Sequence, residues 1–75
     1  MSVTVAPEIA AKLAILEAFR DARISKIELA RRIGKDEKEV RRILDPMHPT
    51  KLAPLQAALA ALGRRLVIGV EEIAA

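Results

Sequence analysis

The sequence predicts a mainly α-helical single domain, residues 1–75, with about four helices and a short strand at each end. Three observations support this fold class. The composition is rich in alanine, leucine, arginine and glutamate, which favour helices. Two patterns that typically begin helices follow one another in the middle of the chain, separated by one glycine. Polar and apolar residues alternate near both termini, as in strands with one buried face.

Composition also limits the classes of function. The chain has no cysteine and a single histidine, His48, so we expect neither disulfides nor a zinc site, and no cofactor. A chain of 75 residues buries a small core, which leaves pairing of two copies as the available source of extra stability. Residues 1–7 lack the features of a signal peptide, and no apolar run could span a bilayer. We therefore expect a cytoplasmic protein.

The first predicted elements are a strand and a long helix. Residues 2–5 alternate polar and apolar side chains within an N-terminal arm, residues 1–6. Pro7 then stands at the start of the helical core, residues 7–62, and we expect the first helix over about 8–22. Its apolar residues recur at helical spacing and predict a core-facing stripe: Ile9, Leu13, Ile15, Leu16, Phe19 and Ala22.

The second helix is predicted over 26–33. Ser25 and Glu28 have the spacing at which the two side chains cap each other's free backbone amides. Gly34 ends this helix, because the residue just past a helix often needs a left-handed backbone that glycine adopts without steric cost.

The third helix is predicted over 37–44. Asp36 and Glu39 repeat the capping spacing only two residues after the glycine, so a new helix must begin almost at once. Asp45, Pro46 and Pro49 end it and predict a loop.

The fourth helix is predicted over about 52–62, with Leu55, Leu59 and Leu62 on one face. Thr50 is a candidate for its N-cap, and Gly63 for its end.

A second strand is predicted within residues 64–71, where the alternation of 66–70 leaves an apolar face and an unpaired edge. We expect this strand to hold a homodimer together, helped by the N-terminal strand. The candidate dimerisation residues are Val3, Val5, Leu66, Val67, Ile68 and Val70. The alternative is that the strand packs against the first helix of its own chain.

Two short helices joined by a turn of about three residues at a glycine predict a helix-turn-helix, whose second helix enters the DNA major groove. At 100° per residue, the apolar Val40, Ile43 and Leu44 lie nearly opposite the basic side chains of 37–44. The candidates for contact with bases are Glu37, Lys38, Arg41 and Arg42. The candidates for contact with phosphates are Ser25, Lys26, Arg31, Lys35 and Lys51, with Arg32 as a lesser one.

The positive charge of the chain lies in its middle. Residues 20–42 hold nine basic and five acidic side chains, a local excess of +4 within a chain of net charge +3. This excess could face a polyanion such as DNA. The alternative is a solvated surface with pairs such as Glu28–Arg32 and Glu37–Arg41. Glu37 could therefore either accept a hydrogen bond from cytosine or merely hold Arg41.

Other nucleic-acid and enzymatic functions lack their usual residues. Phe19 is the one aromatic residue, which leaves no stacking platform for single strands. His48 lies in a proline-containing loop with no thiol and no evident serine partner, so we expect it to pack in the loop. There is no glycine-rich phosphate loop. We expect no enzyme.

Nearly the whole chain resembles the C-terminal DNA-binding region of HicB-family antitoxins, which has a lambda-repressor-like, Xre-type helix-turn-helix. Four segments carry the resemblance: Val5-Ala-Pro-Glu-Ile-Ala-Ala-Lys-Leu, Lys26-Ile-Glu-Leu-Ala-Arg-Arg-Ile-Gly34, Val40-Arg-Arg-Ile-Leu-Asp45 with His48 and Thr50, and Leu59-Ala-Ala-Leu-Gly-Arg-Arg-Leu66.

The resemblance implies a transcriptional repressor. In that family the C-terminal region binds double-stranded operator DNA as a dimer and represses its own toxin-antitoxin operon. A separate N-terminal domain binds HicA, an RNA-cleaving toxin. We expect this chain to depart from that pattern by having no such domain, so that any toxin partner would bind through a domain absent from this chain. The opening of 36–39 is more acidic than is usual for a recognition helix. The alternative function is a protein-interaction or dimerisation module whose helix-turn-helix does not bind DNA.

Overall fold

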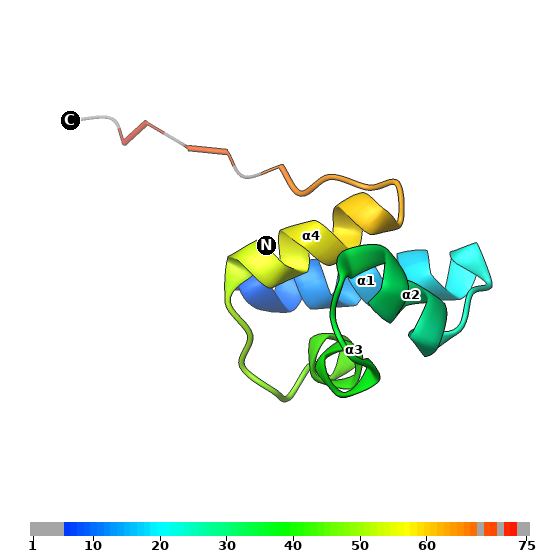
Figure 1. The fold of residues 1–75 in the computed structure, drawn as a ribbon. Helices are drawn as coiled ribbons and strands as arrows, with labels where there is room; N and C mark the ends of the chain where they lie inside the picture. The colour runs from blue at the N-terminus through cyan, green and yellow to red at the C-terminus, as the bar shows by residue number, and fades with distance from the viewer. Residues whose placement is uncertain (1–5, 68, 71, 74–75) are drawn as a thin grey trace.

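The computed structural model describes residues 6–67, 69–70 and 72–73, and this part of the chain folds into four α-helices. They are α1 (Pro7–Ala22), α2 (Lys26–Ile33), α3 (Glu37–Leu44) and α4 (Leu52–Ala61) (Figure 1). The predicted bounds of the second and third helices are confirmed. The first helix begins one residue earlier than predicted, and the fourth ends one residue earlier. The fold class is therefore mainly α, as predicted.

The helix ends follow local backbone chemistry. Gly34 and Gly63 have positive φ angles of 69° and 73°, the left-handed conformation predicted for residues after a helix. Arg23 takes the same conformation after α1, with φ 54°, although it is not glycine. The prediction that Thr50 caps the fourth helix is wrong: Lys51 is the N-cap residue, and the Thr50 hydroxyl donates to the His48 carbonyl instead.

All four helices contribute to one apolar core. α1 packs most extensively against α4, and α2 packs against both α3 and α4 (Figure 1). The largest side chains that are fully buried come from every helix: Ile15, Leu29, Val40, Ile43, Leu55 and Leu59. Burial of these apolar side chains offsets the loss of conformational entropy when this short chain folds.

The apolar stripe predicted for the first helix is only partly right. Ile15 is buried and Leu16 and Phe19 pack against the core, but Ile9 and Leu13 are 44% and 52% exposed. The buried face of α1 is centred instead on residues with small side chains, Ala11 and Ala18, beside Ile15. An alanine-rich helix is apolar on more than one face, so periodicity alone did not decide which face packs on α4.

The C-terminal segment leaves the helical core after Gly63 (Figure 1). Its described residues, 64–67, 69–70 and 72–73, form neither helix nor strand in the single chain. Leu66 still packs partly against the core, whereas Val67 and Val70 are 77% and 96% exposed. Three of the predicted strand residues, Val3, Val5 and Ile68, lie outside the described residues, as does the whole predicted strand 2–5.

None of the described helices is long and apolar enough to cross a membrane.

Candidate nucleic-acid interface

The two central helices are joined by a turn of three residues, 34–36. The Gly34 amide donates to the carbonyl oxygens of Ala30 and Arg31, and the Lys35 amide donates to Ala30 at 2.9 Å. These bonds satisfy carbonyls that the end of α2 would otherwise leave free. Asp36 then accepts the Glu39 amide at 2.8 Å and starts α3. The turn therefore fixes α3 relative to α2 through local bonds.

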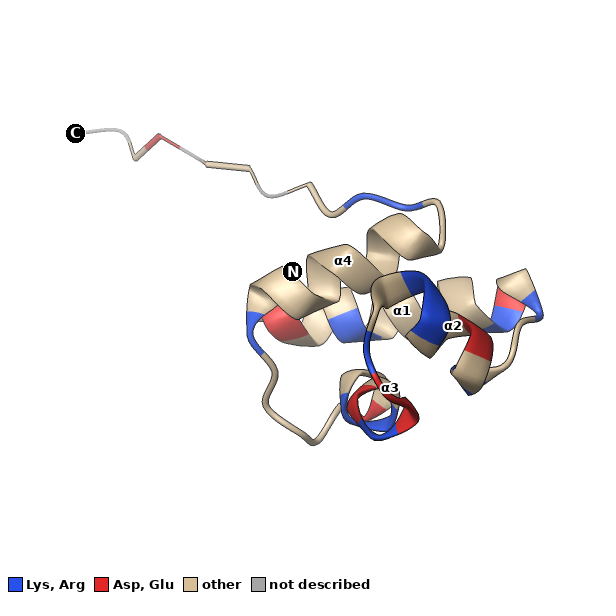
Figure 2. Cartoon of the chain, viewed as in Figure 1, with Lys and Arg blue, Asp and Glu red and all other residues tan. Residues whose placement is uncertain are grey.

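Helix α3 has one buried and one exposed face, as the helical projection predicted. Val40 and Ile43 are fully buried and Leu44 nearly so. Lys38, Arg41 and Arg42 are exposed on the other side, with Glu37 and Glu39 half-buried beside them. Figure 2 shows basic and acidic residues side by side on α3, whereas α4 carries no charge. Any polar ligand of this region would meet α3 through those charged side chains.

The two exposed arginines of α3 are paired with carboxylates of the same helix. Arg41 Nη2 donates to Glu37 Oε1 at 2.8 Å, and Arg42 Nη1 donates to Glu39 Oε2 at 3.4 Å. In this structure Glu37 holds Arg41, which is the second of its two predicted roles. A guanidinium that spends part of its donors on a carboxylate keeps others for an external acceptor. The pairs therefore orient the arginines without using all of their hydrogen-bonding capacity.

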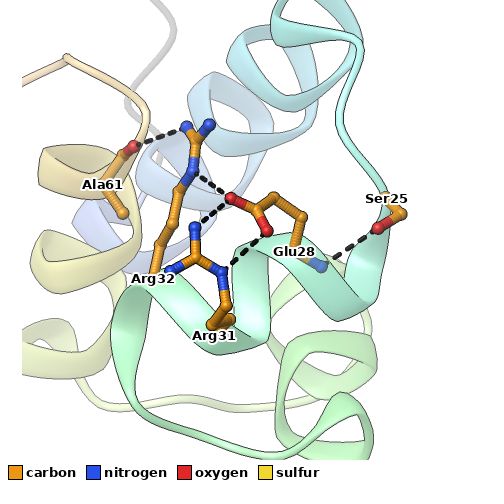
Figure 3. Close-up of polar contacts among 5 residues, drawn as sticks. All are labelled: Ser25, Glu28, Arg31, Arg32 and Ala61. Atoms are coloured by element: carbon orange, nitrogen blue, oxygen red, sulfur yellow. Dashed lines mark hydrogen bonds and ion pairs between the residues drawn. The ribbon is translucent and has the colours of Figure 1, made fainter.

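Helix α2 carries a similar cluster (Figure 3). Ser25 Oγ accepts the Glu28 amide at 3.0 Å, so one half of the predicted reciprocal cap is present. The Glu28 carboxylate does not return this bond; it accepts from Arg31 Nε at 2.9 Å and from Arg32 Nε at 3.1 Å. Arg32 also reaches the Ala61 carbonyl at the end of α4, at 3.5 Å.

These bonds change the protonation equilibria of α2. The hydrogen bonds from Arg31, and then those from Arg32, lower the pKa of Glu28 from 4.5 to about 2. The same carboxylate raises the pKa of Arg31. Glu28 is therefore charged at neutral pH and offsets the basic charge of α2, which makes Arg31 and Arg32 weaker phosphate candidates than their charge alone suggested.

Four lysines of the predicted set stand apart from these pairs. Lys26 begins α2, Lys35 lies in the turn, Lys38 lies on α3, and Lys51 precedes α4. All four are exposed, and none forms an ion pair with another described residue. Because their charges are uncompensated by close partners, they are the side chains best suited to neutralise an external polyanion.

One buried cation near this surface was not predicted from the sequence. Lys12 of α1 is 2% exposed, and its Nζ donates to the carbonyl oxygens of Arg42 at 2.9 Å, Asp45 at 2.7 Å and His48. Burial lowers its pKa, against an opposing effect of the Asp45 and Glu39 carboxylates. The available signal was a lysine one turn from Ile9 and Ile15, on an otherwise apolar stripe.

Lys12 lies at an open groove of about 810 Å³ between the start of α1 and the loop before α4. Its lining is mostly apolar and includes Ile9, Pro46, Met47 and Pro49. His48 also lines the groove, and only its backbone takes part in the hydrogen bonds described for the loop. No group of three or more metal-ligating side chains occurs among the residues that the structure describes.

Comparison with known proteins found no matching family model, but it found several curated relatives. The chain is 38% identical over 69 residues to "Antitoxin HicB 1" of Photorhabdus laumondii subsp. laumondii, a match that covers 92% of this chain and 44% of the relative. It is 43% identical over 58 residues to "Antitoxin HicB" of Escherichia coli strain K12, covering 77% and 42% of the two chains. It is 39% identical over 62 residues to "Antitoxin HicB" of Pseudomonas fluorescens, covering 83% and 42%.

The chain thus spans less than half the length of the curated relatives it matches. Their names and identities support a HicB-family antitoxin.

Proposed function

We propose that this chain is the DNA-binding part of a HicB-type antitoxin, a lambda-repressor-like helix-turn-helix that binds operator DNA as a homodimer. In this proposal it represses the operon that encodes the antitoxin and its toxin, acts in the cytoplasm, and has no enzymatic activity. The toxin partner binds a part of the antitoxin outside the matched segment. The observation that carries the proposal is the division of α3 into an apolar face anchored in the core and an exposed face with three basic side chains.

The length of α3 and its anchoring in the core favour a recognition helix, one that contacts base edges in the major groove. It has eight residues, follows α2 after a three-residue turn, and is held on its buried side by Val40, Ile43 and Leu44. A short helix supported in this way can enter the major groove while the preceding helix lies across the DNA backbone. Lys38, Arg41 and Arg42 then face base edges, with Glu37 beside them.

Three of the four unpaired lysines, Lys26, Lys35 and Lys51, supply the contacts with the DNA backbone. Lys26 lies at the first turn of α2, where free amides and the ammonium group can meet one phosphate together. Lys35 in the turn and Lys51 before α4 flank α3 on either side in the chain. Ser25, by contrast, already uses its side-chain oxygen to cap α2, so its hydroxyl hydrogen is what it can offer a phosphate.

The competing function is a protein-interaction module that does not bind DNA. The observation in its favour is that each of Arg31, Arg32, Arg41 and Arg42 has a carboxylate partner in its own helix. These pairs lower the net positive charge of the surface. A partner interface of this kind would be mainly apolar, and the exposed Ile9, Leu13 and Met47 would be its natural contacts.

A salt titration separates the two functions. Fluorescence anisotropy of labelled duplex DNA from upstream of the gene is measured between 50 and 200 mM salt, with a shuffled duplex of equal composition as control. A dimer that neutralises about six phosphates through these lysines should lose about 10³-fold in affinity over this range. Sequence preference should appear as tighter binding to the upstream duplex. If neither duplex binds at the lowest salt, the DNA-binding proposal is wrong and the interaction module is favoured.

A further inference from the structure

We propose that Lys12 is a positioning residue for DNA recognition: it ties α1 to the last turn of α3 and to the following loop, and so sets how α3 and Lys51 face the DNA. This inference rests on the proposed function. Its structural half, the anchoring of α3 and the loop, can be measured in the free protein without any DNA.

The hydrogen bonds of Lys12 join parts of the chain that are far apart in sequence. Its three acceptors lie 30, 33 and 36 residues away, at Arg42, Asp45 and His48. An ammonium group has three donors, so every donor of Lys12 has a partner. The acceptors belong to the end of α3 and the next four residues. Each carbonyl also accepts one local bond, from the Asp45 amide, the His48 amide and the Thr50 hydroxyl respectively, and Lys12 uses the second acceptor position of each oxygen.

The three bonds of Lys12 are the hydrogen bonds that join α1 to the end of α3 and the loop after it. The other hydrogen bonds of residues 45–50 are local: the Asp45 amide to the Arg42 carbonyl, the Met47 amide to the Asp45 carboxylate, the His48 amide to the Asp45 carbonyl, and the Thr50 hydroxyl to the His48 carbonyl. The core contacts of α3 are apolar, and apolar packing tolerates small rotations and shifts better than hydrogen bonds do. Lys12 therefore fixes the orientation of a helix that the core alone holds less strictly.

Lys12 cannot itself contact DNA. Its side chain is buried, and all of its donors are used within the chain. The positive charge is nevertheless suited to its place, because the C-terminal end of a helix carries partial negative charge. Its influence on DNA binding must therefore act through Arg42, whose carbonyl it holds, and through the loop that leads to Lys51.

Replacement of Lys12 should loosen this region and spare the rest of the fold. Lys12→Met keeps the length and apolar stem of the side chain and removes its three bonds. Of the three acceptor residues, His48 lines the open groove, where water can replace the bond that is lost there. Lys12→Gln keeps an amide with two donors and should give an intermediate result. The matched control is Ile15→Val, which trims a buried side chain one turn later in α1 and removes no hydrogen bond.

The first measurement is amide hydrogen exchange in the free protein. In Lys12→Met the amides of Asp45, Met47 and His48 should exchange at least about tenfold faster, while those of α2 and α4 keep their wild-type rates relative to global unfolding. Lys12→Gln should fall between, and Ile15→Val should change all helices together. Should Lys12→Met fail to fold, the comparison of Lys12→Gln with wild type decides the same question. Unchanged exchange at 45–48 in a folded variant overturns the anchoring.

The second measurement is DNA affinity at a fixed salt concentration at which every variant is folded. Lys12→Met should bind the upstream duplex about tenfold more weakly, a loss of about 1.4 kcal/mol, with a smaller loss on the shuffled duplex. Ile15→Val should bind both duplexes as wild type does. Faster exchange with unchanged affinity would show an anchor that does not position the reading helix, and would overturn the inference. If wild type itself binds neither duplex, the proposed function fails while the exchange data still judge the anchor.

Discussion

Arg41 and Arg42 are each held by a glutamate one turn earlier in α3, and these pairs lie at the surface. Exposed pairs at this spacing contribute about 0.2–0.5 kcal/mol to helix stability. In the proposed function their larger effect is on recognition, since they restrict the arginine side chains before the DNA arrives. A guanidinium that is already oriented loses less conformational freedom when it binds.

The first prediction concerns these two arginines. Arg41→Ala and Arg42→Ala should each weaken binding to the upstream duplex by about 1–3 kcal/mol, because a good base contact is lost, and should leave the fold intact. Anisotropy gives the affinity and circular dichroism the helix content. Arg64→Ala is the matched control: it removes one exposed arginine, paired with Asp21 at 3.4 Å and outside α2 and α3. Wild-type affinity and sequence preference in both α3 variants would show that α3 is not the reading helix.

The second prediction separates the two roles of Glu37. If Glu37 only holds Arg41, Glu37→Gln removes a negative charge facing DNA and should tighten binding to both duplexes alike. If Glu37 accepts a hydrogen bond from a cytosine amino group, the substitution should reduce the preference for the upstream duplex. The structure places Glu37 on Arg41, so we expect the first result. The ratio of the two dissociation constants is the measurement.

The third prediction concerns how the free energy of unfolding changes at acidic pH. Glu28 has a folded-state pKa of about 2 and an ordinary value of 4.5, so the folded chain holds its charged form more tightly than the unfolded chain does. Its contribution is therefore fully present above pH 4.5 and is lost as the pH falls through 2. Wild type should be more stable than Glu28→Gln at pH 6, and most of the difference should be lost at pH 2. Urea unfolding at both pH values measures it, and a difference that stays constant with pH would contradict this assignment.

At the scale of the elements, the residue that follows α1 is less suited to its backbone conformation than the residue that follows α2. Both require a left-handed residue, and α2 ends on Gly34 while α1 ends on Arg23. A side chain in this conformation costs about 1–2 kcal/mol, because Cβ approaches the backbone too closely. The turn between α2 and α3 therefore has the better-suited residue.

The fourth prediction follows from this difference. Arg23→Gly should raise the free energy of unfolding by about 0.5–1 kcal/mol, since relief of the strain exceeds the added entropy of the unfolded chain. The control is Arg20→Gly, which removes the same charge from the last turn of α1 at a helical backbone angle. It should destabilise the domain by about 1 kcal/mol. Urea unfolding measures both, and a destabilised Arg23→Gly variant would show that the Arg23 side chain matters more than its backbone.

At the scale of the whole molecule, the helical core and the C-terminal segment differ in what they bury. The core encloses apolar residues of all four helices. The segment instead exposes Val67, Val70 and Ile73 at 77%, 96% and 95%. Apolar side chains that are exposed together in a small protein commonly mark a contact with another chain. A second copy would supply such a contact, and pairing through residues 64–71 would give a two-fold dimer.

The fifth prediction is that this segment holds the dimer. Deletion of residues 66–75 should convert the dimer to a monomer at micromolar concentration, as measured by light scattering. Val70→Asp is a gentler variant that should have the same effect, because Val70 is almost fully exposed in the single chain. A truncated protein that stays dimeric would rule out the segment as the dimer element. A two-fold dimer would place its two α3 helices about one DNA turn apart, roughly 34 Å.

The sequence by itself determined the helices and the turn between α2 and α3. The signals for these features are local: Ser25 and Asp36 each accept an amide three residues later, and Gly34 adopts the left-handed conformation it was expected to adopt. The faces of α3 were predictable for a similar reason, because Val40, Ile43 and Leu44 leave one sector of a short helix entirely polar. A cap or a helical face depends on residues within one turn, so the printed order of residues contains the information.

Only the tertiary structure decided which face of α1 is buried and what Lys12 does. Alanines make several faces of α1 apolar, and packing against α4 selected the one that contains Ala11 and Ile15 and left Ile9 and Leu13 half-exposed. That choice also carried Lys12 into the interior, where its acceptors are backbone carbonyls at least 30 residues away. Any residue can supply a backbone carbonyl, so no side chain marks the partner in the sequence. The role of Lys12 exists only once α1, α3 and the loop are packed together.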